Sequence, residues 1–341
     1  IVGGIFVYNS RQNLTEETEK QVEKNDFVSY NGWLNVDGTK IKNEKGETIQ
    51  LVGVSSHAIQ WYSSIISPEN IKTLKEDWGI NALRLAVYTQ VDGDLVHEER
   101  LNKRIMELVD FAIAEDIYVI LDWHVLEERN PNKYKYEAKK FFDEFSKKYA
   151  NTPNLIYEIC NEPNGGTVEW NKDVKPYAED VIETIRKNSE KSLVIVGTPG
   201  WCKDFSQVKD NLLEDKNVAY AYHLYSGAEE TKISDLEELI QAGIPIFVSE
   251  WGITDNTGTG EIYIESANKW VEVLNKNDIS WIMWSFSNKD EATAILDYMY
   301  YPKVNMEDHL TPAGKYTKEI IMKTKGKEIQ EDVIEEIEND I

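Results

Sequence analysis

Residues 156–165 read "IYEICNEPNG", an apolar run that stops at an amide and a carboxylic acid, Asn161 and Glu162. The next residue, Pro163, has no backbone N–H to donate, so the run cannot continue as a central strand. A continuous apolar run is typical of a parallel strand that is covered by helices. We therefore expect a buried strand over residues 154–162, whose last two side chains point into a cleft at its carboxyl end.

The chain contains further apolar runs of this kind, with helix-like stretches between and after them. They lie at residues 49–55, 80–88, 117–124, 192–201, 218–225, 244–252 and 279–286. Together with the first run they make eight strand-and-helix units. Eight units favour a (β/α)₈ barrel (TIM barrel) over an open doubly wound sheet, which usually has fewer strands.

Local signals support the helices and add one smaller element. Ser67 is a helix N-cap candidate, Pro68 follows at the first helical position, and Gly79 provides a stop signal. Apolar residues at 101, 105, 108, 109, 112 and 113 share one helical face. The "DG" and "KG" turn signals in residues 30–48 predict a small N-terminal β-hairpin before the first barrel strand.

Composition divides the chain into three parts. Residues 1–26 form an N-terminal segment with a polar linker, residues 27–324 the barrel, and residues 325–341 an acidic C-terminal tail or linker. The opening "IVGGIFV" is typical of the tail of a secretory signal or of a membrane anchor. We therefore expect a secreted, extracellular protein, with the anchor as the alternative, and a monomer as the default state.

Charge and motifs exclude several classes of function. The net charge of −24 argues against nucleic acid or an anionic membrane as the main partner. No glycine-rich phosphate-binding motif follows any predicted strand. The two cysteines, Cys160 and Cys202, lack metal-ligand spacing, and we expect Cys160 to be a buried free thiol.

The active site of a (β/α)₈ barrel lies at the carboxyl ends of its strands. Those ends hold the following polar and aromatic residues: His57, Trp61, Arg84, Tyr88, Asp122, His124, Asn161, Glu162, Trp201, His223, Tyr225, Glu250, Trp284, Lys289 and Glu291. Glu162 and Glu250 follow the fourth and seventh strands, roughly opposite each other. Two facing carboxyl groups are what glycoside cleavage requires, one as acid and one as nucleophile. We assign Glu250 as nucleophile and Glu162 as acid/base, and expect a separation of about 5–5.5 Å.

The motifs "IYEICNEPNG", "VSEWG", "NALRLAVY", "DWH", "YHLY" and "WSFSNKDE" resemble those of glycoside hydrolase family 5, close to bacterial cellulases. The resemblance covers about residues 28–322. It implies an endo-acting, retaining β-1,4-glucanase that needs no metal and no cofactor. Its substrate would be a β-1,4-glucan, and relatives often carry an appended carbohydrate-binding or docking module.

The resemblance also implies roles for individual residues. Glu162 and Glu250 would be catalytic, and Asn161 would hold the sugar 2-hydroxyl. Arg84 and Tyr225 would bond the nucleophile, His124 and His223 would line the site, and Trp284 would stack under the sugar next to the cleavage point. His57, Trp61, Tyr88, Lys289 and Glu291 would contact sugars on the non-reducing side, and Trp201 would be a further sugar platform. Gly200 and Cys202 depart from the family's usual residues, so the resemblance does not predict the shape of the cleft around Trp201.

Four alternatives remain beside this interpretation. Within the same fold, the substrate could be β-mannan, or mixed-linkage glucan or xyloglucan. A metal-dependent barrel hydrolase would use His57, Asp122, His124 and His223, but "SSHAI" lacks the second histidine of the expected HxH pair. A binding protein that has lost its chemistry is disfavoured because both glutamates are present.

Overall fold

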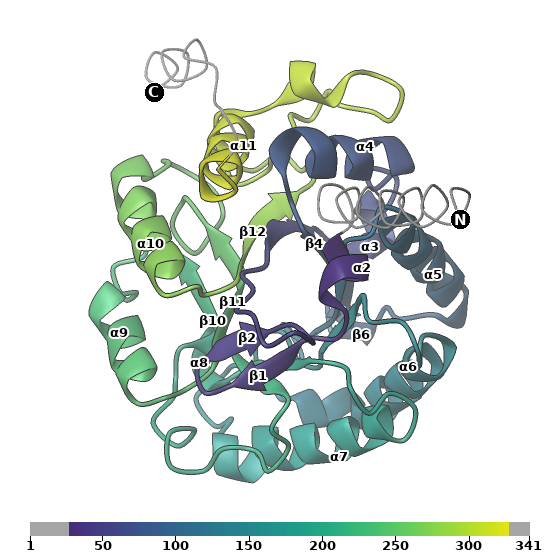
Figure 1. The fold of residues 1–341 in the computed structure, drawn as a ribbon, viewed down its shortest axis with the longest axis vertical. Coiled ribbons are helices and arrows are strands. Elements are labelled where there is room, and N and C mark those ends of the chain that lie inside the picture. The colour runs from purple at the N-terminus through teal and green to yellow at the C-terminus, as the bar shows by residue number, and fades with distance from the viewer. Residues whose placement is uncertain (1–26, 327–341) are drawn as a thin grey trace, which may run out of the picture.

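Eight parallel strands close into a barrel in this computed structural model, which describes residues 27–326 (Figure 1). In chain order they are β3 (Val52–Ser56), β4 (Ala82–Tyr88), β7 (Tyr118–His124), β8 (Leu155–Glu158), β9 (Val194–Val196), β10 (Val218–Tyr225), β11 (Ile246–Gly252) and β12 (Trp281–Phe286). The last strand, β12, pairs with the first, β3, and so closes the barrel. The predicted (β/α)₈ barrel is confirmed.

The helices form a ring outside the strands (Figure 1). They are α4 (Pro68–Thr73), α5 (Glu99–Ala114), α6 (Lys135–Lys148), α7 (Lys175–Arg186), α9 (Ile233–Gln241), α10 (Ile264–Lys276) and α11 (Pro312–Thr324). Two four-residue helices, α3 (Ile59–Tyr62) and α8 (Pro199–Cys202), follow β3 and β9. On α5 the predicted apolar face is buried at Ile105, Leu108, Val109 and Ala112. Burial of such a face, rather than intrinsic helix propensity, supplies most of the stability of helices in a barrel.

The helix predicted after Ser67 begins and ends where the sequence signals lie. The Ser67 hydroxyl accepts a hydrogen bond from the backbone N–H of Asn70, at 3.2 Å, and Pro68 occupies the first turn. The helix then widens into a π-helical turn, Leu74–Trp78, and stops at Gly79, whose φ of 95° is left-handed. Glycine adopts this conformation without the steric cost that a side chain would add.

The amino-terminal end of the barrel is closed by the predicted hairpin and a short helix. The hairpin pairs β1 (Asn35–Asp37) with β2 (Lys40–Lys42), and α2 (Phe27–Asn31) precedes it. Figure 1 shows all three elements lying across the barrel opening. The backbone of α2 is fixed there because Val28 N–H donates to Asp116 O, and the Tyr118 hydroxyl donates to Gly32 O. The opposite end is left for the site.

A second, unpredicted hairpin, β5 (Gln90–Val91) with β6 (Asp94–Leu95), follows β4. Two short 3₁₀ helices, Pro131–Tyr134 and Met306–His309, and a π-helical turn, Trp170–Val174, complete the elements of the described part of the chain. Cys160 and Cys202 are both buried free thiols, as predicted for Cys160. Within residues 27–326, no helix is long and apolar enough to cross a membrane. The predictions for residues 1–26 and 327–341 lie outside the described residues.

Gly53 of β3 is a position where the barrel tolerates no side chain. A Cβ atom built there would lie 1.8 Å from the backbone oxygen of Ala82 on the neighbouring strand. We expect Gly53→Ala to lower the free energy of unfolding by about 3 kcal/mol, because a strand pair must separate to relieve the clash. Thermal unfolding of this variant should be compared with Gly166→Ala, where a Cβ meets nothing within 4 Å. Equal melting temperatures would contradict this account.

Candidate active site

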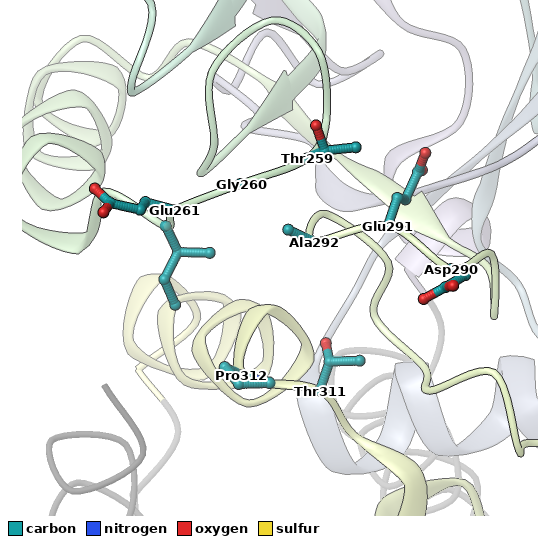
Figure 2. A pocket seen from close by; sticks show the side chains of 9 residues that line it. Thr259, Gly260, Glu261, Asp290, Glu291, Ala292, Thr311 and Pro312 are labelled. Atoms are coloured by element: carbon teal, nitrogen blue, oxygen red, sulfur yellow. The ribbon is translucent and has the colours of Figure 1, made fainter.

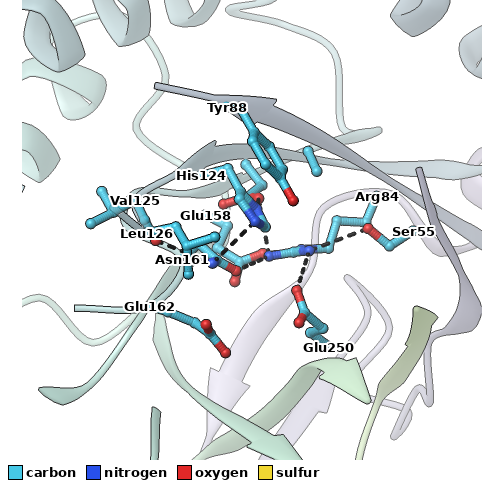
Figure 3. Close-up of polar contacts among 12 residues, drawn as sticks. Ser55, Arg84, Tyr88, His124, Val125, Leu126, Glu158, Asn161, Glu162 and Glu250 are labelled. Atoms are coloured by element: carbon cyan, nitrogen blue, oxygen red, sulfur yellow. Dashed lines mark hydrogen bonds and ion pairs between the residues drawn. The ribbon is translucent and has the colours of Figure 1, made fainter. Parts of the chain in front are cut away.

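Glu162 and Glu250 meet at the carboxyl end of the barrel (Figure 3). One carboxylate oxygen of each lies within 4.8 Å of the other. Glu250 belongs to β11, whereas Glu162 follows β8, which ends at Glu158 rather than at the predicted residue 162. Beyond Glu158 the backbone still runs beside the end of β7, because Asn161 N–H donates to Trp123 O and Glu162 N–H donates to Val125 O. The short separation fits the predicted retaining geometry.

Arg84 stands at the centre of a buried network behind the two glutamates (Figure 3). Its guanidinium is 2.7 Å from Glu158, 3.0 Å from Asp122 and 3.2 Å from Glu250. Burial alone would lower the pKa of Arg84, but these three carboxylates outweigh it and raise the pKa above its ordinary value. Arg84 therefore stays charged and holds the Glu250 carboxylate in place.

Glu158 is a site residue that the sequence interpretation missed. It is fully buried, and its pKa is about 2, because Arg84 and His223 outweigh the cost of its burial. The signal was present in the sequence, since an acid in the middle of an apolar strand, "LIYEI", must have a buried partner.

Asn161 lies behind the cleft surface, and His124 lines the cleft nearby. The Asn161 amide oxygen accepts from Arg84 at 2.6 Å, and its nitrogen donates to Val125 O at 3.2 Å. His124 is stacked on the Tyr88 ring at 4.3 Å, and its Nδ1 lies 2.6 Å from Asp122. Burial and the charge of Arg84 hold the pKa of His124 well below its usual range, so it is a neutral imidazole.

His223 joins the two sides of the site. Its Nδ1 lies 2.8 Å from Glu162 Oε1, and its Nε2 lies 3.0 Å from the Ser249 hydroxyl. Burial lowers the pKa of His223, but hydrogen bonding with the side chains of Glu158 and Glu162 outweighs burial and raises this pKa to about 9. The His223 ring is therefore positively charged at neutral pH, directly beside the predicted acid/base.

Glu250 is nearly buried and accepts a hydrogen bond from the Tyr225 hydroxyl at 2.9 Å. Burial, followed by the nearby Glu162 carboxylate, raises the pKa of Glu250, while His223, Arg84 and Tyr225 act to lower it. A nucleophile must be ionised, and a raised pKa opposes the ionisation of Glu250. Protonation of Glu162 removes the second of the two causes that raise the pKa of Glu250, so this pKa is lower while Glu162 carries the acid proton.

The two glutamates open into a cleft of about 550 Å³. Of the predicted site residues, it is lined by His57, Tyr88, His124, Glu162, Trp201, His223, Tyr225, Glu250, Trp284, Lys289 and Glu291. Arg84 and Asn161 lie behind this surface. Trp61 is half-exposed and lines a neighbouring hollow of about 500 Å³, with its ring centroid 5.9 Å from that of Tyr88 and the two rings nearly perpendicular. The cleft also includes residues that were not predicted: Leu126, Gly200, Lys203, Glu230, Asn256, Thr257 and Gly258.

His57, Lys289 and Glu291 form one connected group in the wall of the cleft. The Lys289 ammonium lies 2.6 Å from Glu291 and 3.2 Å from His57 Nε2. Burial, aided by this ammonium, lowers the pKa of His57 to about 3, so His57 is neutral. Glu291 is also part of a second, larger hollow of about 720 Å³, whose other walls include Glu261, Asp290 and the start of α11 (Figure 2).

Trp201 also lines the cleft and is half-exposed on an unusual turn. Gly200, Trp201 and Cys202 all have left-handed φ values, of 65°, 57° and 60°. For residues with side chains this conformation costs about 1–3 kcal/mol each, and such strain is concentrated at functional sites. The Cys202 thiol donates to Asn161 O at 2.9 Å, which ties the turn to the strand end that carries Glu162.

A closed (β/α)₈ barrel with two adjoining carboxyl groups in an aromatic-lined cleft defines the class of barrel glycoside hydrolases. The sequence model of the family "Cellulase (glycosyl hydrolase family 5)" matches residues 42–290. The chain belongs to glycosyl hydrolase family 5. The family resemblance predicted from the motifs is thereby confirmed, and so is the expectation of a glycoside hydrolase.

The relatives agree in sequence and in structure. Endoglucanase A of Evansella cellulosilytica is 42% identical over 282 residues, which cover 81% of this chain and 57% of that protein. Endoglucanase N of Pectobacterium atrosepticum is 40% identical over 300 residues, covering 86% and 66%. The catalytic domain of Thermobifida fusca endoglucanase Cel5A has a TM-score of 0.80 at 31% identity, covering 86% of this chain and 99% of that domain. The chain thus spans less than two thirds of the length of these two curated relatives.

Proposed function

We propose that this chain is an endo-acting β-1,4-glucanase that works by retaining double displacement. The observation that carries the proposal is the pair Glu162 and Glu250, within 4.8 Å of each other in the cleft of a family 5 barrel. A related Thermobifida fusca catalytic domain, 30% identical, has been solved in complex with cellotetraose. A linear β-1,4-glucan is therefore the substrate that fits best.

In the first step, Glu250 attacks the anomeric carbon while Glu162 gives its proton to the departing glycosidic oxygen. The bond to the leaving sugar breaks as a glycosyl–Glu250 ester forms. In the second step, Glu162 takes a proton from water, the resulting hydroxide attacks the anomeric carbon, and Glu250 is released. Arg84 and Tyr225, which hydrogen-bond the two Glu250 oxygens, fix the orientation of the nucleophile.

The cleft is arranged for a chain rather than for a single sugar. Trp284 lines the cleft, with its ring centroid 4.9 Å from that of His57 and 5.5 Å from that of His124, and it offers a face for the sugar at the cleavage point. Lys289, Glu291 and Trp201 line the cleft as well. These groups are more than one sugar can contact, so we expect several consecutive sugars to bind across the two glutamates, which leads to internal cleavage.

Polymer size bears on the setting in which the enzyme acts. An insoluble or very long glucan does not enter a cell, so its hydrolysis requires an enzyme outside it; secretion is part of the proposal. The greater length of the curated relatives also fits a further module, for which a carbohydrate-binding or docking function is proposed. Activity should persist in EDTA, since each step above uses only side chains; loss of activity that zinc restores would support a metal-dependent hydrolase instead.

The proposal is tested by measuring reducing-sugar release from carboxymethylcellulose and from β-mannan side by side. Release from the cellulose, abolished by Glu250→Gln, is the expected result. Preference for mannan would keep the mechanism and overturn the substrate, and mixed-linkage glucan and xyloglucan belong in the same series. Binding of oligosaccharides without release from any polymer would support a binding protein.

A further inference from the structure

Ser249 is a buried hydroxyl beside the nucleophile, and strand β11 is distorted in a way that brings it there. Along β11 three steps separate Phe247 from Glu250, whereas only two separate their partners Ala221 and His223 on β10. The same excess exists on the β12 side. An extra residue in a strand, a β-bulge, re-aims side chains and is over-represented next to active sites. In an undistorted strand, Ser249 and Glu250 would point to opposite faces; here both reach the site.

The Ser249 hydroxyl closes a continuous chain of hydrogen bonds between the two catalytic carboxyl groups. From Glu162 the chain runs to His223 at 2.8 Å, to Ser249 at 3.0 Å and to Glu158 at 2.7 Å. From Glu158 it continues to Arg84 at 2.7 Å and to Glu250 at 3.2 Å. His223, Ser249, Glu158 and Arg84 are at most 1% exposed, so water does not compete for these bonds.

The direction of each proton in the chain follows from the groups themselves. Glu158 is ionised and can only accept, so the single Ser249 hydrogen points to Glu158. The Ser249 oxygen is then free only to accept, which requires a hydrogen on His223 Nε2. His223 Nδ1 and Glu162 Oε1 consequently share one further proton across their 2.8 Å contact.

We propose that Ser249 is a positioning residue that keeps His223 protonated on Nε2, so that His223 Nδ1 stores the acid proton of Glu162. The inference rests on the function proposed above. In the first step the shared proton leaves with the sugar alcohol, and in the second step a proton from water replaces it, so the balance closes in each turnover. While the proton is shared, it lies between His223 Nδ1 and Glu162 Oε1, where it is available for transfer to the departing glycosidic oxygen.

Several other titratable or charged groups face His223, and the charged ones act on the same equilibrium. They are Glu158 and Glu162 from β8 and the segment after it, Glu250 from β11, Asp122 and His124 from β7, and Arg84, which faces these groups from β4. The anionic members favour the charged imidazolium and the cation opposes it. Ser249 differs from all of them because it is uncharged; its effect is to select which nitrogen of His223 carries the fixed hydrogen.

The test replaces Ser249 with Ala and follows kcat/KM for cellotetraose against pH. Without the hydroxyl, His223 Nε2–H loses its acceptor, so His223 gives up its proton more easily and the alkaline limb moves to lower pH by about one unit. Above that limb the rate should fall about tenfold. For 2,4-dinitrophenyl cellobioside, whose leaving group needs little acid help, the loss should be much smaller. Ser249→Thr, which keeps a hydroxyl, should restore the limb.

A second measurement is independent of turnover. The ¹⁵N chemical shifts of His223 should show Nε2 protonated at pH 7 in the original protein and a change of tautomer or a lower pKa in Ser249→Ala. An unmoved alkaline limb, or an equal loss for both substrates with unchanged shifts, would overturn the positioning role. If no glycan is cleaved by the original protein, the proposed function fails, while the nitrogen shifts still decide the role of Ser249.

Discussion

Glu250→Ala is expected to lose glucan hydrolysis by a factor on the order of 10⁵, because the covalent intermediate cannot form without its carboxylate. The rest of the site should remain, since Arg84 keeps two other carboxylate partners, Asp122 and Glu158, when Glu250 is removed. The measurement is single-turnover hydrolysis of an activated aryl cellobioside, together with thermal unfolding to show that the fold persists.

Rescue by a small anion identifies the two roles separately. Azide added to Glu250→Ala enters from the face that the nucleophile occupied and gives an α-linked glycosyl azide. In Glu162→Ala, the covalent intermediate still forms with a good leaving group, and azide attacks it from the other face to give a β-linked product. Swapped products would exchange the assignments of Glu162 and Glu250, and an inverting course in the original protein would contradict double displacement.

The barrel could be read from the sequence because it depends on short-range patterns. The apolar runs, the apolar face of α5 and the cap at Ser67 each depend on residues within about ten positions of one another, and the structure has all of them. Strand ends were less accurate: β8 stops at Glu158, because beyond it the backbone bonds reach Trp123 and Val125 instead of forming a regular ladder.

The site was predictable only in part, for a physical reason. Strand ends converge in a barrel, so Glu162, Glu250 and Trp284 could be placed together before their geometry was known. The roles of Glu158 and Ser249 depend on partners far away in the sequence: Glu158 is 74 residues from Arg84, and a bulge turns Ser249 into the site. No local pattern contains those contacts.

Loop residues were the least predictable. Lys203, Glu230 and Asn256 lie on three different loops, yet Glu230 accepts from both other residues, at 3.2 Å and 3.0 Å, along the wall of the cleft. Trp61, expected among the residues of the cleft, lines the neighbouring hollow instead. Loop conformation, which the periodicity of strands and helices does not specify, decides such positions.

Arg84→Met is expected to have the largest effect on stability of any single substitution in the site. It removes the cation from a buried cluster and leaves Asp122, Glu158 and Glu250 without it. Breaking a buried ion pair from one side costs about 3–5 kcal/mol, because the remaining charge is uncompensated. Arg186→Met is the matched control, since Arg186 binds Asp215 at 2.7 Å but at a partly exposed site remote from the cleft.

The pH dependence of this loss has a definite sign. In the original protein, Arg84 and His223 hold the pKa of Glu158 at about 2, so its contribution to stability is present above the unfolded value and is lost as pH falls. Without Arg84, burial raises the pKa of Glu158 above its unfolded value, and the pKa values of Asp122 and Glu250, which burial already raises in the original protein, rise further. The destabilisation that their ionisation causes is then absent at low pH, where they are protonated, and grows as pH rises. The difference in unfolding free energy between the two proteins should therefore be smallest near pH 4 and largest near pH 7.

Thermal or urea unfolding at both pH values measures this difference, with cellotetraose hydrolysis recorded on the same samples. A deficit that stayed constant with pH would mean that Arg84 acts by packing and not by charge. Arg84→Lys keeps one positive charge but cannot reach Asp122, Glu158 and Glu250 from a single ammonium group. It should recover part of the stability at pH 7 while leaving the Glu250 carboxylate poorly oriented. Stability that returns without activity would separate the two tasks that the guanidinium performs at once: neutralising the buried cluster, and aiming the nucleophile.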